Sequence, residues 1–115
     1  MNNISPQLQN QIAQFQQVQQ QLQAVSTQKL QMEAQKKEVE RTSAELAKAT
    51  GDVYKSSGSL LIKVDDKEKL KADLEESLET LEVRIKGLER QEKTLRDKYE
   101  SLQDAINKAV GQEEE

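Results

Sequence analysis

The stretch VYKSSGSLLIKV, residues 53–64, is the one part of this 115-residue chain that lacks a helical pattern. Its centre, SSGS, has the composition of a turn, and Gly58 there can adopt a positive φ. We therefore predict a β-hairpin, with strands over 53–55 and 60–64 and a turn over 56–59. Because an isolated two-stranded hairpin is marginally stable in water, this one needs a partner.

The segment before the hairpin has the pattern of one long helix, which we predict over residues 6–50. Ser5 suits the N-cap, Pro6 suits the first helical position, and Gly51 suits a left-handed C-cap. Two series of apolar residues each keep a seven-residue spacing, and the three-residue offset between them indicates a locally overwound coiled coil. The first series is Leu8, Phe15 and Leu22, and the second is Val18, Val25, Met32, Val39 and Leu46. The neighbouring seam positions of the second series are polar: Lys29, Lys36 and Ser43.

The segment after the hairpin has a more regular coiled-coil pattern, which predicts a helix over residues 66–110. Asp65 and Asp66 are candidate N-caps, and Glu68 would complete a capping box with Asp65. Seam positions then alternate at spacings of four and three, with Glu92 as the single charged member. They are Leu78, Leu81, Ile85, Leu88, Glu92, Leu95, Tyr99, Leu102, Ile106 and Ala109. Gly87 lies off this seam and costs roughly 1 kcal/mol of helix propensity relative to alanine.

Two long helices joined by a short connection favour an antiparallel hairpin of helices. The predicted fold is mainly α: a single domain over 1–115, in which a long antiparallel coiled coil is joined by one β-hairpin. A lone hairpin cannot bury its apolar face, and its strand edges would stay open. We expect hairpins of several subunits to pair into a closed β-barrel platform. The expected oligomerisation residues are Val53, Tyr54, Leu60, Leu61, Ile62 and Val64.

Composition argues against several classes of function. Hydrophobic residues make up 34% of the chain and aromatic residues 3%, enough for a narrow seam but not for a rounded core. Basic residues are mixed with acidic ones at a net charge of −4, so we expect no nucleic-acid partner. Cysteine and histidine are absent, and there is no phosphate loop, metal-ligand cluster or nucleophile–base pair. We therefore expect no enzyme, no metal and no cofactor.

The sequence also has no feature of a membrane or exported protein. No apolar run approaches the roughly 20 residues that span a bilayer, and no basic segment followed by an apolar run opens the chain. We expect a cytoplasmic protein without a membrane partner.

The chain resembles a β-class prefoldin subunit, and the archaeal members in particular. The resemblance rests on the order helix, VYKSSGSLLIKV, helix, on the opening QLQNQIAQFQQVQQQLQ (7–23) and on the run LETLEVRIKGLERQEK (78–93). Only one hairpin fits between Gly51 and Asp65, whereas α-class subunits have two. The resemblance implies an ATP-independent chaperone that holds unfolded proteins at its coiled-coil tips and passes them to a group II chaperonin. It implies a hexamer of two alpha and four beta subunits, so the expected partners are an alpha subunit, other copies of this chain, unfolded clients and the chaperonin.

The ends of the two helices are the candidate client site. Residues 1–28 carry no charge, and thirteen glutamines lie between Gln7 and Gln35 without breaking the helical spacing. The apolar residues there either zip together as an ordinary coiled-coil end or splay and expose an apolar patch. The resemblance favours client binding by this tip cluster: Ile4, Leu8, Ile12, Phe15, Leu102, Ile106 and Val110.

The last five residues, 111–115, are expected to follow the helix as an acidic tail. Such a tail either only aids solubility or docks onto a basic surface of the chaperonin, and the candidate docking residues are Glu113, Glu114 and Glu115. Two other functions stay open: a structural or adaptor coiled coil that bundles with one fixed partner, and a prefoldin-like filament in which hairpins pair onward without closing.

Overall fold

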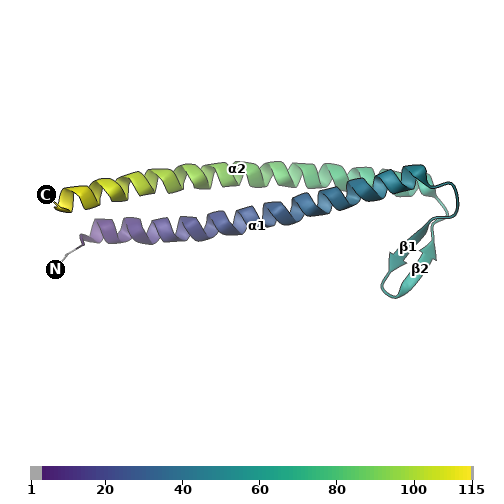
Figure 1. Cartoon of the computed structure of the whole chain (residues 1–115), viewed down its shortest axis with the longest axis horizontal. Helices are drawn as coiled ribbons and strands as arrows, with labels where there is room; N and C mark the ends of the chain where they lie inside the picture. The colour runs from purple at the N-terminus through teal and green to yellow at the C-terminus, as the bar shows by residue number, and fades with distance from the viewer. Residues whose placement is uncertain (1–3, 115) are drawn as a thin grey trace. The chain divides into compact units, whose positions relative to one another are not determined.

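A computed structural model describes residues 4–114, with the side chains of 4–111, and contains two long helices separated by one hairpin (Figure 1). In chain order the elements are α1 (Pro6–Lys48), β1 (Tyr54–Ser57), β2 (Leu60–Lys63) and α2 (Lys67–Glu114). The predicted mainly α class and the single hairpin between the helices are confirmed. The chain divides into two compact units, and each is described by itself: unit 1 runs up to Lys29 and from Gly87 onward, and unit 2 is residues 30–86. The single domain over 1–115 stays a prediction.

Side-chain caps fix where both helices begin. The Ser5 Oγ accepts a hydrogen bond from the Leu8 backbone N–H at 3.1 Å, and the Asp66 Oδ1 accepts one from the Lys69 N–H at 3.0 Å. Each cap satisfies a backbone donor that the first helical turn leaves without a partner. Because Asp66 rather than Asp65 is the N-cap, α2 begins at Lys67, one residue later than predicted.

Both helices end elsewhere than predicted. α1 stops at Lys48 instead of residue 50, because the Ala49 N–H bonds to the Leu46 carbonyl three residues back and tightens the last turn. The expected left-handed cap at Gly51 is wrong, since Gly58 is the only residue with positive φ in the described part of the chain. α2 continues past the predicted end at residue 110 to Glu114, because Gly111 keeps a negative φ and glutamine and glutamate favour helix.

The hairpin has a two-residue turn, tighter than the four-residue turn predicted. The register pairs Tyr54 with Lys63 and Ser57 with Leu60, so β1 extends through Ser57 instead of ending at 55. Gly58 has φ of 59°, whereas Ser59 does not have a positive φ, as in a type II′ turn. This turn matches the twist of the strands it joins, so pairing extends further toward the turn than the sequence pattern suggested.

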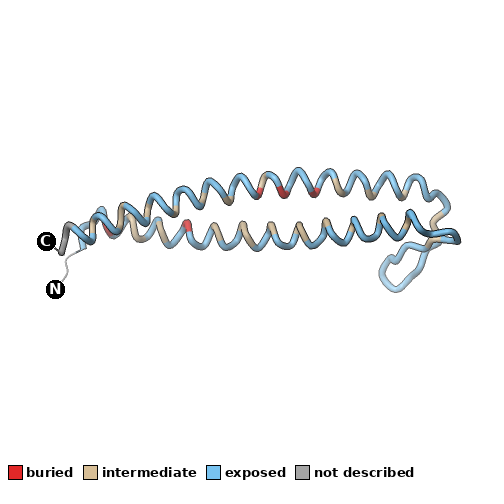
Figure 2. The backbone as a smooth tube through the Cα atoms, turned by 45° about the horizontal axis from the view of Figure 1, so that its top comes forward, coloured by how far each residue is buried: buried red, intermediate tan, exposed pale blue. Residues whose placement is uncertain are grey.

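The core is a narrow seam between helices, as Figure 2 shows for the few buried residues. In unit 1 the buried residues are Leu8 and Val18 of α1 and Leu88 of α2; in unit 2 they are Leu81 and Ile85 of α2. The helix segments of unit 1 run antiparallel, because Ser26 contacts Glu92 whereas the earlier Phe15 contacts the later Tyr99.

Candidate functional site

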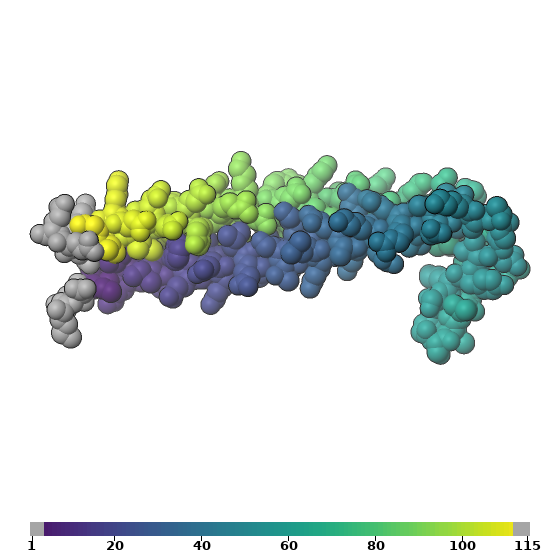
Figure 3. Space-filling model, viewed as in Figure 1, coloured from purple at the N-terminus to yellow at the C-terminus, as the bar shows by residue number. Residues whose placement is uncertain are grey.

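The hairpin of unit 2 carries large apolar side chains that nothing in the described chain covers. The exposed fractions of Tyr54, Leu60, Leu61 and Ile62 lie between 51% and 74%. Figure 3 shows the hairpin, in teal, standing clear of the helices that it connects. Of the predicted oligomerisation residues, only Val53 and Val64, at the base of the hairpin, are half-buried. The predicted assembly residues therefore lie together on an accessible surface.

Both edges of the hairpin also carry backbone groups that point outward. The Val64 N–H donates to the Val53 carbonyl at 2.8 Å, so this pair belongs to the hydrogen-bonded set of the ladder. Hydrogen-bonded and non-hydrogen-bonded pairs alternate along antiparallel strands, so the N–H and C=O groups of Tyr54 and Ser56 on β1, and of Leu61 and Lys63 on β2, face away from the partner strand. The described residues form no third strand. Each edge is thus a template for pairing with another strand.

The tip cluster lies in unit 1, and its members differ in exposure. Leu8 is almost fully buried, with 2% of its surface exposed, whereas Ile4 and Val110 are 39% and 41% exposed. Ile12, Phe15, Leu102 and Ile106 are half-buried. In this structure the ends of the helices are therefore packed together rather than splayed. Unless the helices separate, only Ile4 and Val110 of the tip cluster are accessible to a client.

The aromatic rings of Phe15, in the tip cluster, and Tyr99 pack against each other in unit 1. The rings of Phe15 on α1 and Tyr99 on α2 have centroids 4.5 Å apart and planes tilted by 30°. Aromatic pairs in such contact stabilise by about 0.5–1.5 kcal/mol beyond the area that they bury. Opening of the tip cluster as far as Phe15 would therefore break a specific contact in addition to exposing apolar surface.

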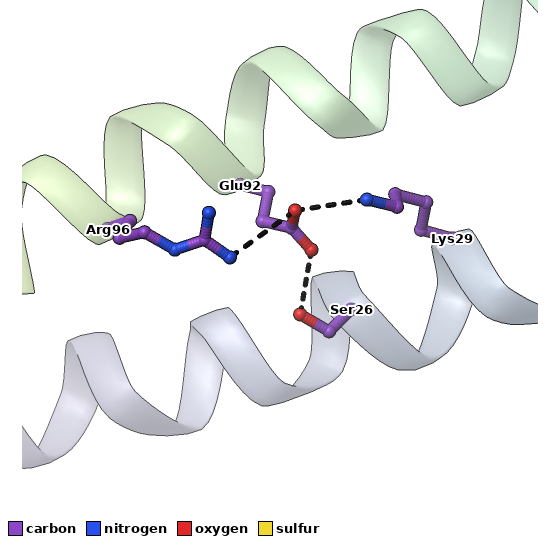
Figure 4. A network of polar contacts seen from close by, with 4 residues as sticks. All are labelled: Ser26, Lys29, Glu92 and Arg96. Atoms are coloured by element: carbon purple, nitrogen blue, oxygen red, sulfur yellow. Dashed lines mark hydrogen bonds and ion pairs between the residues drawn. The ribbon is translucent and has the colours of Figure 1, made fainter.

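A polar network occupies the seam position where the sequence has Glu92 (Figure 4). The Glu92 carboxylate accepts a hydrogen bond from the Ser26 Oγ at 2.9 Å and pairs with the Lys29 Nζ at 3.1 Å. Arg96, one turn further along α2, approaches the same carboxylate at 3.5 Å. Only 12% of the Glu92 side chain is exposed. Glu92 is therefore held by two α1 side chains at one fixed relative position of the helices.

These contacts lower the pKa of Glu92 below its ordinary value of 4.5. The hydrogen bond from Lys29 is the largest cause, followed by the one from Ser26, and the charges of Lys29 and Arg96 act in the same direction. Burial opposes the shift. The network thus favours the charged carboxylate, which is the form that can accept both hydrogen bonds.

The sequence marked Glu92 as an exception in the seam but did not give its partners. Its polar counterpart Lys29 had been noted separately, as had Lys36, which lies 3.6 Å from Glu82 in unit 2. Aligning α1 with α2 in antiparallel register would have predicted that Lys29 lies opposite Glu92 and Lys36 opposite Glu82. The third polar position, Ser43, behaves differently: its Oγ is buried and has no hydrogen-bond partner among the described residues.

Across residues 4–114, no helix is long and apolar enough to cross a membrane. The same residues contain no cluster of three or more side chains suited to hold a metal ion. The three predicted docking residues lie outside the part of the chain that the structure describes: Glu115 entirely, and Glu113 and Glu114 in their side chains.

Comparison with known proteins points to one family. The family model described as Prefoldin subunit matches residues 9–113. The prefoldin subunit beta of Methanococcus vannielii is 50% identical over 109 residues, which are 95% of this chain and 96% of that relative. The prefoldin subunit beta of Thermoplasma volcanium is 49% identical over 55 residues, and that alignment covers 48% of this chain and only 44% of the relative. The crystal structure of the prefoldin beta subunit from Thermococcus strain KS-1 matches with a TM-score of 0.83 at 40% identity, over 95% of this chain and 96% of that one.

Proposed function

This chain belongs to the prefoldin family, and we propose that it is the beta-type subunit of an ATP-independent holding chaperone. In this proposal its hairpin assembles with those of an alpha subunit and of other copies of the chain into a hexamer of two alpha and four beta subunits. The ends of its helices bind unfolded proteins, and the complex passes them to a group II chaperonin in the cytoplasm.

The uncovered hairpin is the observation that carries the proposal. Four large apolar side chains and two outward-facing strand edges are exposed within a few residues of one another. A soluble protein rarely leaves such a surface open unless a partner covers it. Pairing of several hairpins edge to edge would satisfy the backbone groups and bury the apolar face at once. An adaptor coiled coil with one fixed partner would need the helical seam but not this surface.

The tip cluster supports the client-binding part of the proposal. Ile4 and Val110 give each chain two exposed apolar side chains, and the first 28 residues contain no charged side chain that would select clients by the sign of their charge. Two side chains of this size would bind a client weakly. Several chains in one assembly would hold an unfolded protein together, because each further contact becomes an intramolecular event.

The test of client binding removes the two exposed residues of the tip cluster. The double variant Ile4→Ser with Val110→Ser, in the complete complex, should need about tenfold more protein to suppress the aggregation of chemically denatured citrate synthase without nucleotide. The matched control is Leu30→Ser with Val83→Ser, which removes two apolar side chains that are 65% and 68% exposed in unit 2. The control should hold the reporter as well as the unmodified complex does.

Size-exclusion chromatography of each variant separates holding from assembly. If the tip variant still forms the full complex and still suppresses aggregation at the unmodified concentration, client binding by the tip cluster is wrong. If the unmodified complex does not suppress aggregation at all, the holding function itself is wrong.

A further inference from the structure

Lys55 places a positive charge on an apolar face of the hairpin. The register puts it directly across from Ile62, so both side chains lie on the face that also carries Leu60. Leu60 and Ile62 are 65% and 51% exposed, and Lys55 is exposed as well. A partner that covers these two apolar side chains therefore also covers the lysine between the strand ends.

The described chain offers this ammonium group no counter-charge. The other lysine of the hairpin, Lys63, lies on the opposite face, and its Nζ is 3.9 Å from the Asp52 carboxylate. The Lys55 side chain makes no ion pair or hydrogen bond with any residue that the structure describes. Residues 53–64 contain no aspartate or glutamate. Because covering an unpaired charge costs free energy, the partner has to supply the opposite charge.

A second copy of the chain does not supply it through its own β1. The outward backbone groups of β1 belong to Tyr54 and Ser56. An antiparallel β1–β1 contact that uses all of these groups pairs Tyr54 of each copy with Ser56 of the other. Lys55 then lies opposite Lys55 in a non-hydrogen-bonded pair, in which the side chains approach most closely. Like charges directly opposite each other destabilise a sheet, so β1 disfavours pairing with itself.

The β2 strand of a second copy does not supply the opposite charge either. Its outward groups belong to Leu61 and Lys63, and the register that uses both places Ile62 opposite Lys55. The ammonium group would then lie between two isoleucines without a counter-charge. Two β2 strands paired with each other would instead put Ile62 opposite Ile62, which is a favourable apolar pair. β2 therefore suits a second copy, whereas β1 suits a strand of different sequence.

We propose that the β1 edge is the heterotypic contact of this chain, and that it selects a strand of a different subunit with an aspartate or glutamate opposite Lys55. That carboxylate pairs with the Lys55 Nζ while the strand bonds to the outward groups of Tyr54 and Ser56. Lys55 is then a specificity-determining residue, because its charge attracts an acidic strand and repels a second β1. This selection rests on the proposed function and adds which edge takes the other subunit and what chemistry that subunit presents.

Carbodiimide crosslinking of the complete complex tests this contact directly. The reagent activates a carboxylate, and an amine in contact with it displaces the reagent as a urea and forms an amide, so no spacer remains. The complex is recovered with this chain tagged in its own cells, crosslinked, digested and analysed by mass spectrometry. The internal control is the pair of Lys63 and Asp52, which are close enough to be joined within one chain.

We expect Lys55 to be joined to an aspartate or glutamate of a different subunit, alongside the control crosslink. A Lys55 crosslink to a second copy of this chain would overturn the proposal. Absence of any Lys55 crosslink, while the control crosslink forms, would also overturn it. A complex that contains no other kind of chain would contradict the proposed function itself.

Charge reversal separates the charge of Lys55 from its shape. Lys55→Glu should lower the amount of the other subunit recovered with this chain severalfold at low salt, where ion pairs are least screened. The matched control Lys37→Glu makes the same change at an exposed position of α1 and should leave recovery unchanged. Lys55→Arg, which keeps the charge, should recover nearly as much as the unmodified chain. Full recovery by Lys55→Glu would contradict the proposal, and so would equal losses in Lys55→Glu and Lys55→Arg.

Discussion

Glu92 is the residue at which the helix pair of unit 1 departs from a plain apolar seam. Its carboxylate is bound by Ser26 and Lys29, two side chains of the facing helix that lie three residues apart. A shift of one helix along the other would separate this carboxylate from both partners. A single polar residue in a coiled-coil seam commonly fixes register at some loss of stability, and we interpret the Glu92 network in this way.

The lowered pKa of Glu92 gives a prediction about pH. A carboxyl group whose pKa is lower in the folded state contributes stability above its unfolded pKa, and this contribution is lost as the pH falls through the folded value. Glu92→Gln should therefore lower the thermal midpoint at pH 7, and the difference from the unmodified protein should shrink as the pH falls below 4.5. Circular dichroism at a series of pH values measures both.

Glu89→Gln is the matched control, because it removes the same charge from an exposed position three residues away. It should change the midpoint little at any pH. A Glu92→Gln difference that is the same at pH 7 and pH 3 would contradict a role for the charged carboxylate.

Ser43 supports a prediction of the opposite sign. Its buried Oγ has no hydrogen-bond partner among the described residues, and burying a hydroxyl without one costs about 1–3 kcal/mol on mutational scales. Ser43→Ala should therefore raise the free energy of unfolding in urea by about 1 kcal/mol. Ser101→Ala, at an exposed position of α2, controls for helix propensity and should raise it by less. Equal effects of the two substitutions would show that the Ser43 hydroxyl is satisfied in solution.

At the scale of elements, the hairpin is the part that its own chain cannot stabilise. α1 and α2 bury apolar side chains against each other, whereas all eight strand residues are exposed. Assembly and helix formation should therefore respond to different substitutions. The reason is that the helical seam is buried within one chain, whereas the hairpin surface is not.

Substitution in the hairpin should dissociate the complex without unfolding the helices. Leu60→Ser with Ile62→Ser removes the apolar face of β2 and should lower the mass measured by light scattering, while the helical circular dichroism signal stays within about a tenth of the original. Leu30→Ser with Val83→Ser removes two apolar residues outside the hairpin that are at least as exposed as Leu60 and Ile62, and it should leave the mass unchanged. Retention of the full mass by the hairpin variant would contradict assembly through this surface.

Features set by neighbouring residues were predictable from the sequence, and features that need a partner were less so. The caps depend on contacts within one turn, so composition and spacing identified Ser5 and limited the second cap to Asp65 or Asp66, although the capping box expected at Asp65 was wrong. The strand limits were wrong because the sequence SSGS allows either a four-residue or a two-residue turn, and only pairing of Ser57 with Leu60 decides between them. The Glu92 network needs the register of one helix against the other.

Taken as a whole, the chain is proposed to carry surfaces for two kinds of partner. In the proposed function the hairpin binds other subunits, and the tip cluster binds unfolded polypeptide. In the proposed function neither surface would require a bound nucleotide, since each would act through apolar contact and hydrogen bonding. Holding therefore should depend on assembly, because one chain offers only weak contacts and several offer avidity.

A native mass spectrum of the complex, recovered with this chain tagged in its own cells, tests assembly and client holding together. We expect four copies of this chain with two of a longer, two-hairpin chain. Addition of reduced, carboxymethylated α-lactalbumin without nucleotide should then increase the mass by that of the bound probe. A 1:1 or 2:2 bundle with a single helical partner would contradict the account, and so would a hexamer that gains no mass.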